Sequence, residues 1–265
     1  MTNNNPIIKA EDVTISKALD LSKGEIISLV GGGGKSTLMK TLALELADSG
    51  YKVIITTTTH ILHDQGTGYF ISKKDKKSIY AEIQKAIISN NIITAVCRQE
   101  PTGKLVGPDP DIIPGFLEFA DFVIVEADGA QRKPLKAPNQ TEPVIVPETS
   151  IVIAVAGIDG VGKVFKDIVF RHEIASKLTG LSPEDVVTPG AVATLMAHPE
   201  GITRTSPPHA RRVAFINKVD DEEKIELAKE IASSSKIHPV FSRVIIGCLG
   251  GSLPKVQFIQ INQTR

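Results

Sequence analysis

The sequence of 265 residues contains no tryptophan, and aromatic residues make up only 5% of it. A chain so poor in aromatic side chains lacks the stacking surfaces on which many proteins bind single-stranded nucleic acid. Hydrophobic residues nevertheless reach 42%, which is enough for a large core of aliphatic side chains. We therefore expect an aliphatic sheet flanked by helices, and no nucleic-acid partner.

An excess of charge of either sign is also absent, because 30 lysines and arginines balance 30 aspartates and glutamates. No overall electric field then draws the protein to nucleic acid or to a membrane surface. Cys97 and Cys248 lack the spacing of metal-binding pairs, so neither a disulfide framework nor a zinc site is expected. No apolar run approaches the ~18 residues of a membrane span, and residues 1–6 lack the pattern of a signal peptide. We expect a cytoplasmic protein without a membrane partner.

What the sequence does contain is a run of four glycines between two patterned segments. An apolar run at 25–30 precedes the glycines and is typical of a buried strand, whereas leucines recur every four residues between positions 38 and 46 and predict a helix. A strand, a glycine loop and a helix therefore follow one another. Such a loop turns backbone N–H groups toward an anion at the positive end of the helix. The residues expected to bind phosphate are Gly31, Gly32, Gly33, Gly34, Lys35, Ser36 and Thr37.

The side chains that follow the glycines fit a bound nucleotide. Lys35 is expected to meet the outer phosphates, and Ser36 to hold Mg²⁺ through its hydroxyl. The common phosphate-binding pattern has a further glycine six residues before the lysine, where this sequence has Leu29. Short loops of this kind are known in ATP-dependent Mur-type ligases. The alternative is a strand-to-helix turn without a ligand, but turn geometry alone does not require the lysine and the hydroxyl.

Two carboxylates follow another apolar run, at 122–125. A carboxylate at the tip of a strand beside a phosphate loop is the kind of residue that holds Mg²⁺ or its water shell. The two carboxylates alternate along an extended chain, so one can approach the metal while the other faces a different side. We expect Ser36 with Glu126 or Asp128 to place the metal, and Lys35, Glu126 and Asp128 to take part in catalysis. The spacing from Glu126 to the glycine three residues later also resembles a switch element of GTPases. An ordinary acidic turn is the alternative.

A third motif, Asn217-Lys218-Val219-Asp220, follows an apolar run at 213–216 and precedes a helical pattern. In GTPases, Asn-Lys-x-Asp after a buried strand reads guanine, because the aspartate accepts hydrogen bonds from the ring N–H and the exocyclic amine. Adenine presents the wrong donors. We therefore expect Asn217, Lys218 and Asp220 to contact the base, and GTP to be favoured over ATP.

Two further segments are candidates for binding a second substrate. A run of threonines ends in a histidine at the carboxyl end of the strand expected near 53–55, the edge at which open parallel sheets bind ligands. A basic, proline-containing loop at 130–138 is expected to overhang the phosphate site. Ordinary strand and solvent-loop roles remain open for both segments. The candidate residues are Thr57, Thr58, Thr59, His60, Arg132 and Lys133.

Apolar runs alternate with helical patterns along the chain, which predicts a three-layer α/β fold like that of P-loop NTPases. We expect a mostly parallel sheet with helices on both faces, forming a single domain over 1–265 with a helical and loop insertion around 160–210. Expectations at the margins are a helix at 7–22, a loop or short hairpin at 63–78, a loop at 98–114, a last core strand at 240–247 and an edge strand at 254–262.

Taken together, an ordered set of segments runs through most of the chain: Gly31-Gly32-Gly33-Gly34-Lys35-Ser36-Thr37, Thr56-Thr57-Thr58-Thr59-His60, Val125-Glu126-Ala127-Asp128-Gly129-Ala130, Lys136-Ala137-Pro138, Glu142-Pro143, Gly157 to Lys163 and Asn217-Lys218-Val219-Asp220. This set resembles the YqeC-like family, which is regarded as a group of accessory proteins for selenium-dependent molybdenum hydroxylases. The resemblance implies a nucleotide-binding helper in the maturation of such an enzyme or its cofactor.

Three functional hypotheses follow from these motifs. The leading one is a Mg²⁺-dependent P-loop NTPase that hydrolyses GTP (or ATP) as a maturation factor, with a nucleoside triphosphate and a molybdenum hydroxylase or its cofactor-assembly proteins as partners. The second is an ATP-dependent ligase or kinase that acts on a small molecule, suggested by the short loop. The third is a nucleotide-gated module that binds a partner without significant turnover.

Overall fold

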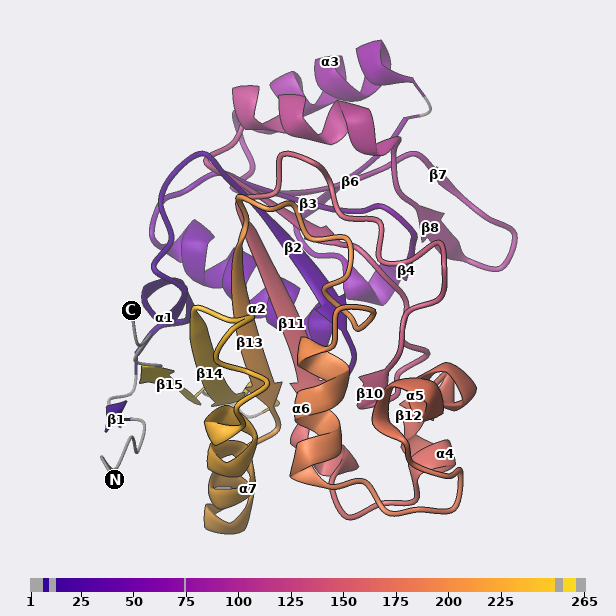
Figure 1. Ribbon diagram of the computed structural model, residues 1–265. Helices are drawn as coiled ribbons and strands as arrows, with labels where there is room; N and C mark the ends of the chain where they lie inside the picture. The colour runs from indigo at the N-terminus through magenta and orange to yellow at the C-terminus, as the bar shows by residue number, and fades with distance from the viewer. Residues whose placement is uncertain (1–6, 10–12, 74, 251–254, 261–265) are drawn as a thin grey trace.

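A ten-stranded sheet forms the centre of the computed structural model, which describes residues 7–9, 13–73, 75–250 and 255–260 (Figure 1). Every neighbouring pair from β14 to β5 is parallel, whereas β15 pairs antiparallel with both β14 and β1. In spatial order the strands are β1 (Ile7–Lys9), β15 (Lys255–Gln260), β14 (Arg243–Cys248), β13 (Arg211–Asn217), β11 (Ile151–Gly157), β2 (Glu25–Gly31), β9 (Phe122–Glu126), β3 (Val53–Thr57), β6 (Ile92–Val96) and β5 (Tyr69–Ser72).

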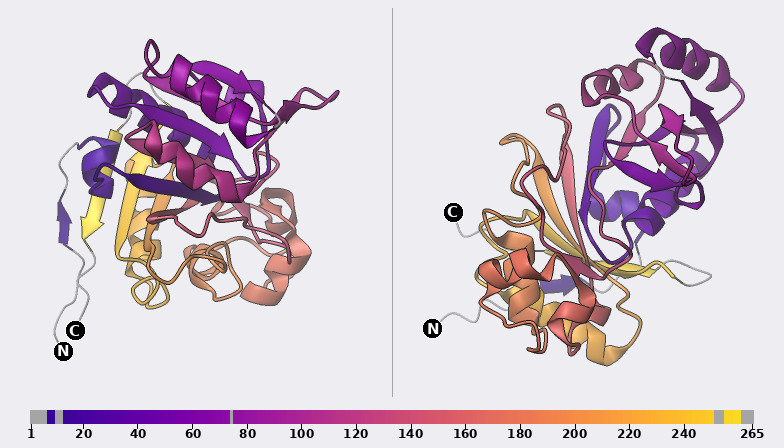
Figure 2. Two further views of the ribbon diagram at one scale, coloured as in Figure 1. Left: turned by 90° about the horizontal axis from the view of Figure 1, so that it is seen from above. Right: turned by 90° about the vertical axis from the view of Figure 1, so that its right-hand side faces the viewer.

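Helices cover both faces of this sheet, as the two views of Figure 2 show. The expected three-layer α/β architecture with a mostly parallel sheet is therefore confirmed. The α-helices are α1 (Ile15–Leu19), α2 (Lys35–Asp48), α3 (Lys76–Ala86), α4 (Phe165–Ile168), α5 (His172–Thr179), α6 (Pro189–Ala197) and α7 (Glu222–Ser233), and the 3₁₀ helices are η1 (His63–Gln65), η2 (Pro110–Glu118) and η3 (Ile158–Gly160).

The strands carry apolar side chains on both sides because both sides are buried, as parallel sheets require. Alternate residues of β11 illustrate this: Ile153 packs with α1 and α2 on one face, while Ala154 packs with α5, α6 and α7 on the other. A third cluster lies under α3 and η2, over β9, β3 and β6. The sheet is thus closed to water on both faces, and only its edges and strand ends are free to bind a ligand.

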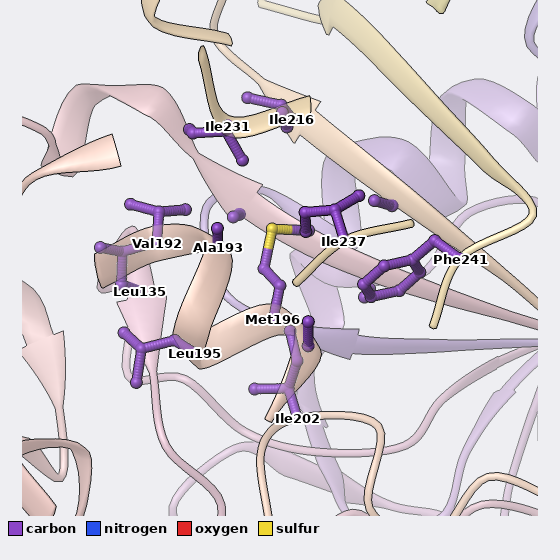
Figure 3. Close-up of a cluster of buried hydrophobic side chains, with 14 of the residues drawn as sticks. Leu135, Val192, Ala193, Leu195, Met196, Ile202, Ile216, Ile231, Ile237 and Phe241 are labelled. Atoms are coloured by element: carbon purple, nitrogen blue, oxygen red, sulfur yellow. The ribbon is translucent and has the colours of Figure 1, made fainter. Parts of the chain in front are cut away.

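Helix α6 is the most deeply buried of the helices in the described residues, since every side chain from Ala191 to Ala197 is buried. Figure 3 shows Met196 of this helix among Ile237 and Phe241, with Ile231 of α7 nearby. This packing fixes the segment between β11 and β13 against the sheet. Two short sheets complete the fold: β10 (Leu135–Lys136) with β12 (Val169–Phe170), and β4 (His60–Leu62) with β8 (Lys104–Val106) and β7 (Arg98–Gln99).

The helix expected at 7–22 is wrong in large part. Ile7–Lys9 form β1, and the helix α1 covers only Ile15–Leu19 within the described part of that range. The Thr14 hydroxyl accepts a hydrogen bond from the N–H of Lys17 and starts α1, and Asp20 ends it in the left-handed conformation at φ 54°. The apolar residues early in the chain therefore reflect one short strand and one short helix.

Strands also lie in the segment 63–78, expected to be a loop or short hairpin, and in the segment 98–114, expected to be a loop. Tyr69–Ser72 form β5, the parallel edge strand beside β6, because Ile71 is buried beneath α3. The range 98–114 contains β7, β8 and the beginning of η2. The last core strand is confirmed as β14, and the expected edge strand as β15; residues 254, 261 and 262 of that expectation lie outside the described residues.

The carboxyl ends of β2, β9 and β13 lie at the same edge of the sheet, because these strands are parallel within the same sheet. The glycine loop follows β2, the two carboxylates follow or end β9, and the Asn-Lys-x-Asp motif begins at the end of β13. This is the edge at which open α/β sheets bind ligands. Within the described ranges, no helix has the length and apolar character that a membrane crossing needs.

Candidate phosphate-binding site

A cavity of about 1060 Å³ opens at this edge of the sheet. Its wall combines the glycine loop, the start of α2, strand β4, the loop after β9 and the junction of β12 with α5. Twelve of the residues singled out from the sequence line it: Gly32, Gly33, Gly34, Lys35, Ser36, Thr37, Thr59, His60, Glu126, Arg132, Lys133 and Lys218. Six do not: Gly31, Thr57, Thr58, Asp128, Asn217 and Asp220.

Some backbone N–H groups of the glycine loop donate hydrogen bonds within the protein, and others line the cavity without an acceptor. The first three glycines donate within the protein: Gly31 to the Asp128 carboxylate at 3.0 and 3.2 Å, Gly32 to the carbonyl of Val155 at 3.0 Å, and Gly33 to the carbonyl of Lys133 at 3.0 Å. The next four N–H groups, from residue 34 to residue 37, have no acceptor in the described part of the chain. They form the first turn of α2, where an anion is the natural acceptor.

Gly31, Gly33 and Gly34 each combine a positive φ with a close approach that leaves no room for a Cβ. Gly33 has φ 76°, and a Cβ there would lie 2.1 Å from the backbone nitrogen of Gly157. Gly34 has φ 122°, and a Cβ there would lie 2.3 Å from Nδ2 of Asn217. The same Nδ2 donates a hydrogen bond of 2.8 Å to the carbonyl of Gly33. Asn217 is buried and holds the phosphate loop through this bond, and its expected contact with the base stays a prediction.

Lys35 begins α2 with its ammonium turned back over the loop. Its Nζ donates to the carbonyl of Gly31 at 2.6 Å and lies 3.1 Å from Asp128 and 3.9 Å from Glu126. Burial disfavours the charge, but attraction to Asp128 and then to Glu126 outweighs it, so the pKa of Lys35 is raised above its ordinary value. The site therefore holds a fixed positive charge beside the four free N–H groups.

Ser36 and Glu126, both predicted metal ligands, are in direct contact. The Ser36 hydroxyl donates to Oε2 of Glu126 at 2.9 Å and accepts from Nε2 of Gln65 at 2.8 Å. Burial raises the pKa of Glu126, and the like charge of Asp128 adds to this, against the opposing effects of Lys35 and the Ser36 hydrogen bond. Gln65 was not recognised from the sequence, because a glutamine in a short 3₁₀ helix has no distinguishing pattern.

The oxygens of Ser36 and Glu126 are donors of the kind that Mg²⁺ prefers. Among the described residues, no group of three or more His, Cys, Asp or Glu side chains forms a metal cluster. At nucleotide sites Mg²⁺ is usually bound by one or two protein oxygens, substrate phosphates and water. Ser36 and Glu126 are thus the pair that would hold it.

Asp128 has a different environment from Glu126, although only one residue separates them. Its side chain is fully buried, and its oxygens accept from the N–H of Gly31 and lie 3.1 Å from Lys35 and 3.0 Å from Lys136. Within the described residues, no hydrogen bond joins Asp128 to Ser36. Asp128 therefore lies behind the loop, where it holds the backbone of Gly31 and the ammonium of Lys35, whereas Glu126 is the carboxylate that contacts Ser36.

The buried charges continue beyond Asp128 toward the far end of the cavity. Lys136, which is also buried, donates to the carbonyl of Gly129 at 2.6 Å and to Glu142 at 2.8 Å, and Glu142 accepts from Arg171 at 2.5 Å. Burial opposes the Glu142 charge, but hydrogen bonds from Arg171 and Lys136 lower the pKa of Glu142 overall. Lys136 and Glu142 were not predicted as site residues, because their partners come from distant elements.

Only Lys218 of the Asn-Lys-x-Asp motif lines the cavity. Lys218 has φ 67° and pairs with Asp159 at 2.7 Å. Asp220 is exposed and pairs with Lys224, one turn into α7. Lys218 is therefore placed to meet a ligand, whereas the carboxylate of Asp220 pairs with the first turn of the helix that follows it.

The candidate substrate residues are divided in the same way. The hydroxyls of Thr57 and Thr58 donate to the carbonyls of Glu126 and Val144, each at 2.7 Å, and so hold neighbouring segments together. Thr59 and His60 line the cavity, and Nε2 of His60 lies 3.3 Å from Glu100. Lys133 donates to the carbonyl of Asp167, and Arg132 is exposed at the rim.

A family model described as "YqeC protein" matches residues 27–173, which is more than half of the chain. The chain belongs to the YqeC family. A relative from Escherichia coli (strain K12), named "Uncharacterized protein YqeC", is 33% identical over 218 residues, covering 81% of this chain and 84% of that protein. The resemblance inferred from the sequence motifs is thereby confirmed.

The range matched to the YqeC family contains the phosphate loop, both carboxylates after β9 and the buried charges as far as Arg171. The Asn-Lys-x-Asp motif lies beyond it. Among solved structures, the signal recognition particle receptor FtsY from Elizabethkingia anophelis is similar with a TM-score of 0.38 and 14% identity, covering 84% of this chain and 59% of that chain.

Proposed function

We propose that this protein binds a nucleoside triphosphate together with Mg²⁺ and hydrolyses it as a Mg²⁺-dependent NTPase. The observation that carries the proposal is the set of four consecutive N–H groups, from Gly34 to Thr37, that face the cavity without an acceptor in the described residues. Lys35 lies beside them, and the oxygens of Ser36 and Glu126 meet within 2.9 Å. This combination fits phosphate and its metal better than any neutral ligand.

The chemistry follows from where these groups point. The N–H groups and the Lys35 ammonium stabilise negative charge on the outer phosphates, including the charge that develops during cleavage. For this, Lys35 moves its ammonium from Gly31 and Asp128 to the phosphate. Bound Mg²⁺ would supply further positive charge at Ser36 and Glu126. Asp128 keeps the loop backbone in place through the N–H of Gly31.

GTP is the first nucleotide to test. The Asn-Lys-x-Asp sequence supports it, Lys218 lines the cavity and Asn217 clamps the phosphate loop. In this account Asp220 releases Lys224 and turns toward the base when GTP binds.

A second candidate is an ATP-dependent ligase or kinase. It is supported by the pairing of Asp220 with Lys224 outside the cavity. It is also supported by the short loop, in which Leu29 is a fully buried residue of β2 where the longer phosphate-binding pattern has a glycine.

Calorimetric titration with GTP, ATP and CTP in the presence of Mg²⁺ tests the proposal. We expect GTP to bind more tightly than ATP, and Asp220→Asn to remove the preference. Glu226→Gln, which changes an exposed carboxylate on the same helix, is the matched control. If ATP binds at least as well as GTP and Asp220→Asn changes nothing, guanine recognition is wrong and the second candidate is favoured.

The accessory role in maturing a selenium-dependent molybdenum hydroxylase is the finer part of the proposal, and the family resemblance supports it. If the role is correct, hydroxylase matured together with this protein gains activity, and hydroxylase matured with the Lys35→Ala variant does not. Equal hydroxylase activity after maturation with the wild-type protein and with Lys35→Ala would show that maturation does not depend on nucleotide binding. Phosphate release measured alongside distinguishes a turning-over NTPase from a module that only binds.

A further inference from the structure

Backbone strain is concentrated around the cavity. In the described part of the chain, five residues other than glycine have a left-handed φ, and four of these line the cavity: Gln131 at 48°, Arg132 at 61°, Arg171 at 60° and Lys218 at 67°. The left-handed region is unfavourable for side chains of this size and persists where the surrounding structure holds it, most often at functional sites. Three of the four are cationic, so the strain presents positive charge to the cavity.

The cavity is also richer in positive than in negative side chains. Seven lysines and arginines line it, compared with four aspartates and glutamates. The side chains of two of them, Lys104 and Arg132, have no ion-pair or hydrogen-bond partner among the described residues. The cationic residues are Lys35, Lys40, Lys104, Arg132, Lys133, Arg171 and Lys218.

Arg171 has the geometry of an oxyanion receptor. One guanidinium nitrogen, Nη1, donates to Glu142, and the guanidinium carbon lies 4.5 Å from the ring centroid of Phe170. The other guanidinium N–H groups have no acceptor in the described residues, and Arg171 and Phe170 both line the cavity. Glu142 holds one edge of the guanidinium and Phe170 packs on one of its faces. Its remaining N–H donors lie in one plane, which suits carboxylate and phosphate oxygens.

The two ends of the cavity belong to one connected arrangement. Arg171 is joined to Lys35 through Glu142, Lys136 and Asp128, and each link is an ion pair of 3.1 Å or less. The volume of about 1060 Å³ is at the upper end of what single small-molecule sites occupy. The cavity therefore has room for a second ligand beside a nucleotide, at a fixed position relative to the phosphate loop.

We propose that Arg132 and Arg171 form a second oxyanion subsite, which binds a small acidic co-substrate in the same cavity as the nucleotide. The co-substrate carries a phosphate or a carboxylate group, and its acidic group is received by the two guanidiniums. This inference rests on the proposed function, because it places the co-substrate beside a nucleotide held at the phosphate loop.

The test uses the full-length protein loaded with Mg²⁺ and a non-hydrolysable analogue of whichever nucleotide binds. Calorimetric titrations with inorganic phosphate and with citrate are its two arms, and the arm that saturates tells a phosphate group from a carboxylate. We expect Arg132→Asn and Arg171→Asn each to weaken that binding about tenfold, as loss of a charge-assisted hydrogen bond does. Asparagine tolerates the left-handed backbone, so strain is not added.

Lys85→Gln on α3 is the control, because it removes an exposed cation that does not line the cavity. Arg132 is exposed and has no partner in the described residues, so its variant remains informative even if Arg171→Asn destabilises the fold. The proposal is overturned if neither anion saturates the nucleotide-loaded protein, or if Arg132→Asn binds the anion as well as Lys85→Gln does.

A further titration separates this inference from the proposed function. The same anions are titrated into the Lys35→Ala variant without nucleotide, whose phosphate loop is disabled. Anion binding that persists there and depends on Arg132 supports the subsite even if no nucleotide binds to the wild-type protein, in which case only the proposed function fails. Anion binding that disappears with Lys35 assigns the anion to the phosphate loop and overturns the subsite.

Discussion

Replacing Asp128 with asparagine removes a negative charge that two buried lysines share. The Asp128 oxygens lie 3.1 Å from Nζ of Lys35 and 3.0 Å from Nζ of Lys136, and they accept from the N–H of Gly31. Asparagine has nearly the same shape, so packing is preserved while the charge is lost. The two ammonium groups then depend on Glu126, at 3.9 Å from Lys35, and on the Glu142 carboxylate, at 2.8 Å from Lys136.

The expected magnitude follows from the cost of breaking a buried ion pair by removing one partner, which is about 3–5 kcal/mol. For a protein of this size, 1 kcal/mol corresponds to a shift of about 2–4 °C in Tm. Asp128→Asn is therefore expected to lower Tm by about 6–20 °C. Thermal unfolding followed by circular dichroism, at neutral pH and without nucleotide, measures this directly.

The double variant Asp128→Asn with Lys136→Met makes the test specific. If the loss comes from an uncompensated buried charge, removing the Lys136 ammonium restores part of the stability that Asp128→Asn costs. The single variant Lys136→Met completes the cycle and gives the interaction energy. An Asp128→Asn protein with unchanged Tm, or a double variant whose losses simply add, would refute this account of the buried charges.

Three further predictions concern the loop and its neighbours. Glu126→Gln is expected to weaken Mg²⁺-dependent nucleotide binding at least about tenfold. Tm should stay nearly unchanged, because burial already disfavours the Glu126 charge. A titration that keeps its Mg²⁺ dependence while the protein loses stability would contradict this prediction. Gly33→Ala is expected to lower the free energy of unfolding in urea by about 2–5 kcal/mol, because its Cβ would overlap Gly157. Gly162→Ala, at φ 77° with open space around it, should lower it only by the cost of the left-handed backbone. The folded-state pKa of Glu142 lies below its ordinary value of 4.5, so the Glu142 carboxylate stabilises the fold above pH 4.5 and loses this effect as pH falls through the folded pKa. The difference in unfolding free energy between wild type and Glu142→Gln, measured with urea, should therefore shrink over that range. A difference that grows on acidification would contradict this prediction.

The central strands could be predicted because each is a continuous apolar run buried on both faces. The runs at 25–30, 122–125, 151–156 and 213–216 all lie within strands of the parallel sheet. Ile7–Lys9 could not be recognised as a strand, because its partner β15 is at the other end of the chain and leaves no local pattern. The edge strand β5 has only four residues, of which Ile71 alone is fully buried, and such a short run beside a loop does not predict a strand of the central sheet.

In the candidate site, too, the parts formed by neighbouring residues could be predicted from the sequence, and the parts formed by distant segments could not. The phosphate loop is encoded in consecutive residues, so its position between a strand and a helix could be read from the sequence. The ion-pair series from Asp128 to Arg171 depends on segments brought together by folding. Lys136 and Glu142 lie in segments that resemble the family, but no local pattern predicts their partners. Asn217 illustrates the limit of a motif: the residue type was recognised, but its contact with Gly33 is decided by the packing of two strand ends.

Calorimetric titration of Mg²⁺-nucleotide into the wild-type and Lys35→Ala proteins tests the central claim most directly. The account predicts saturable binding at one site in the wild type, weakened at least about tenfold by loss of the Lys35 ammonium, while Lys85→Gln binds like the wild type. Circular dichroism confirms that the variants are folded. Equal affinity of the wild-type and Lys35→Ala proteins, or a folded wild-type protein that binds no nucleotide, would contradict the account.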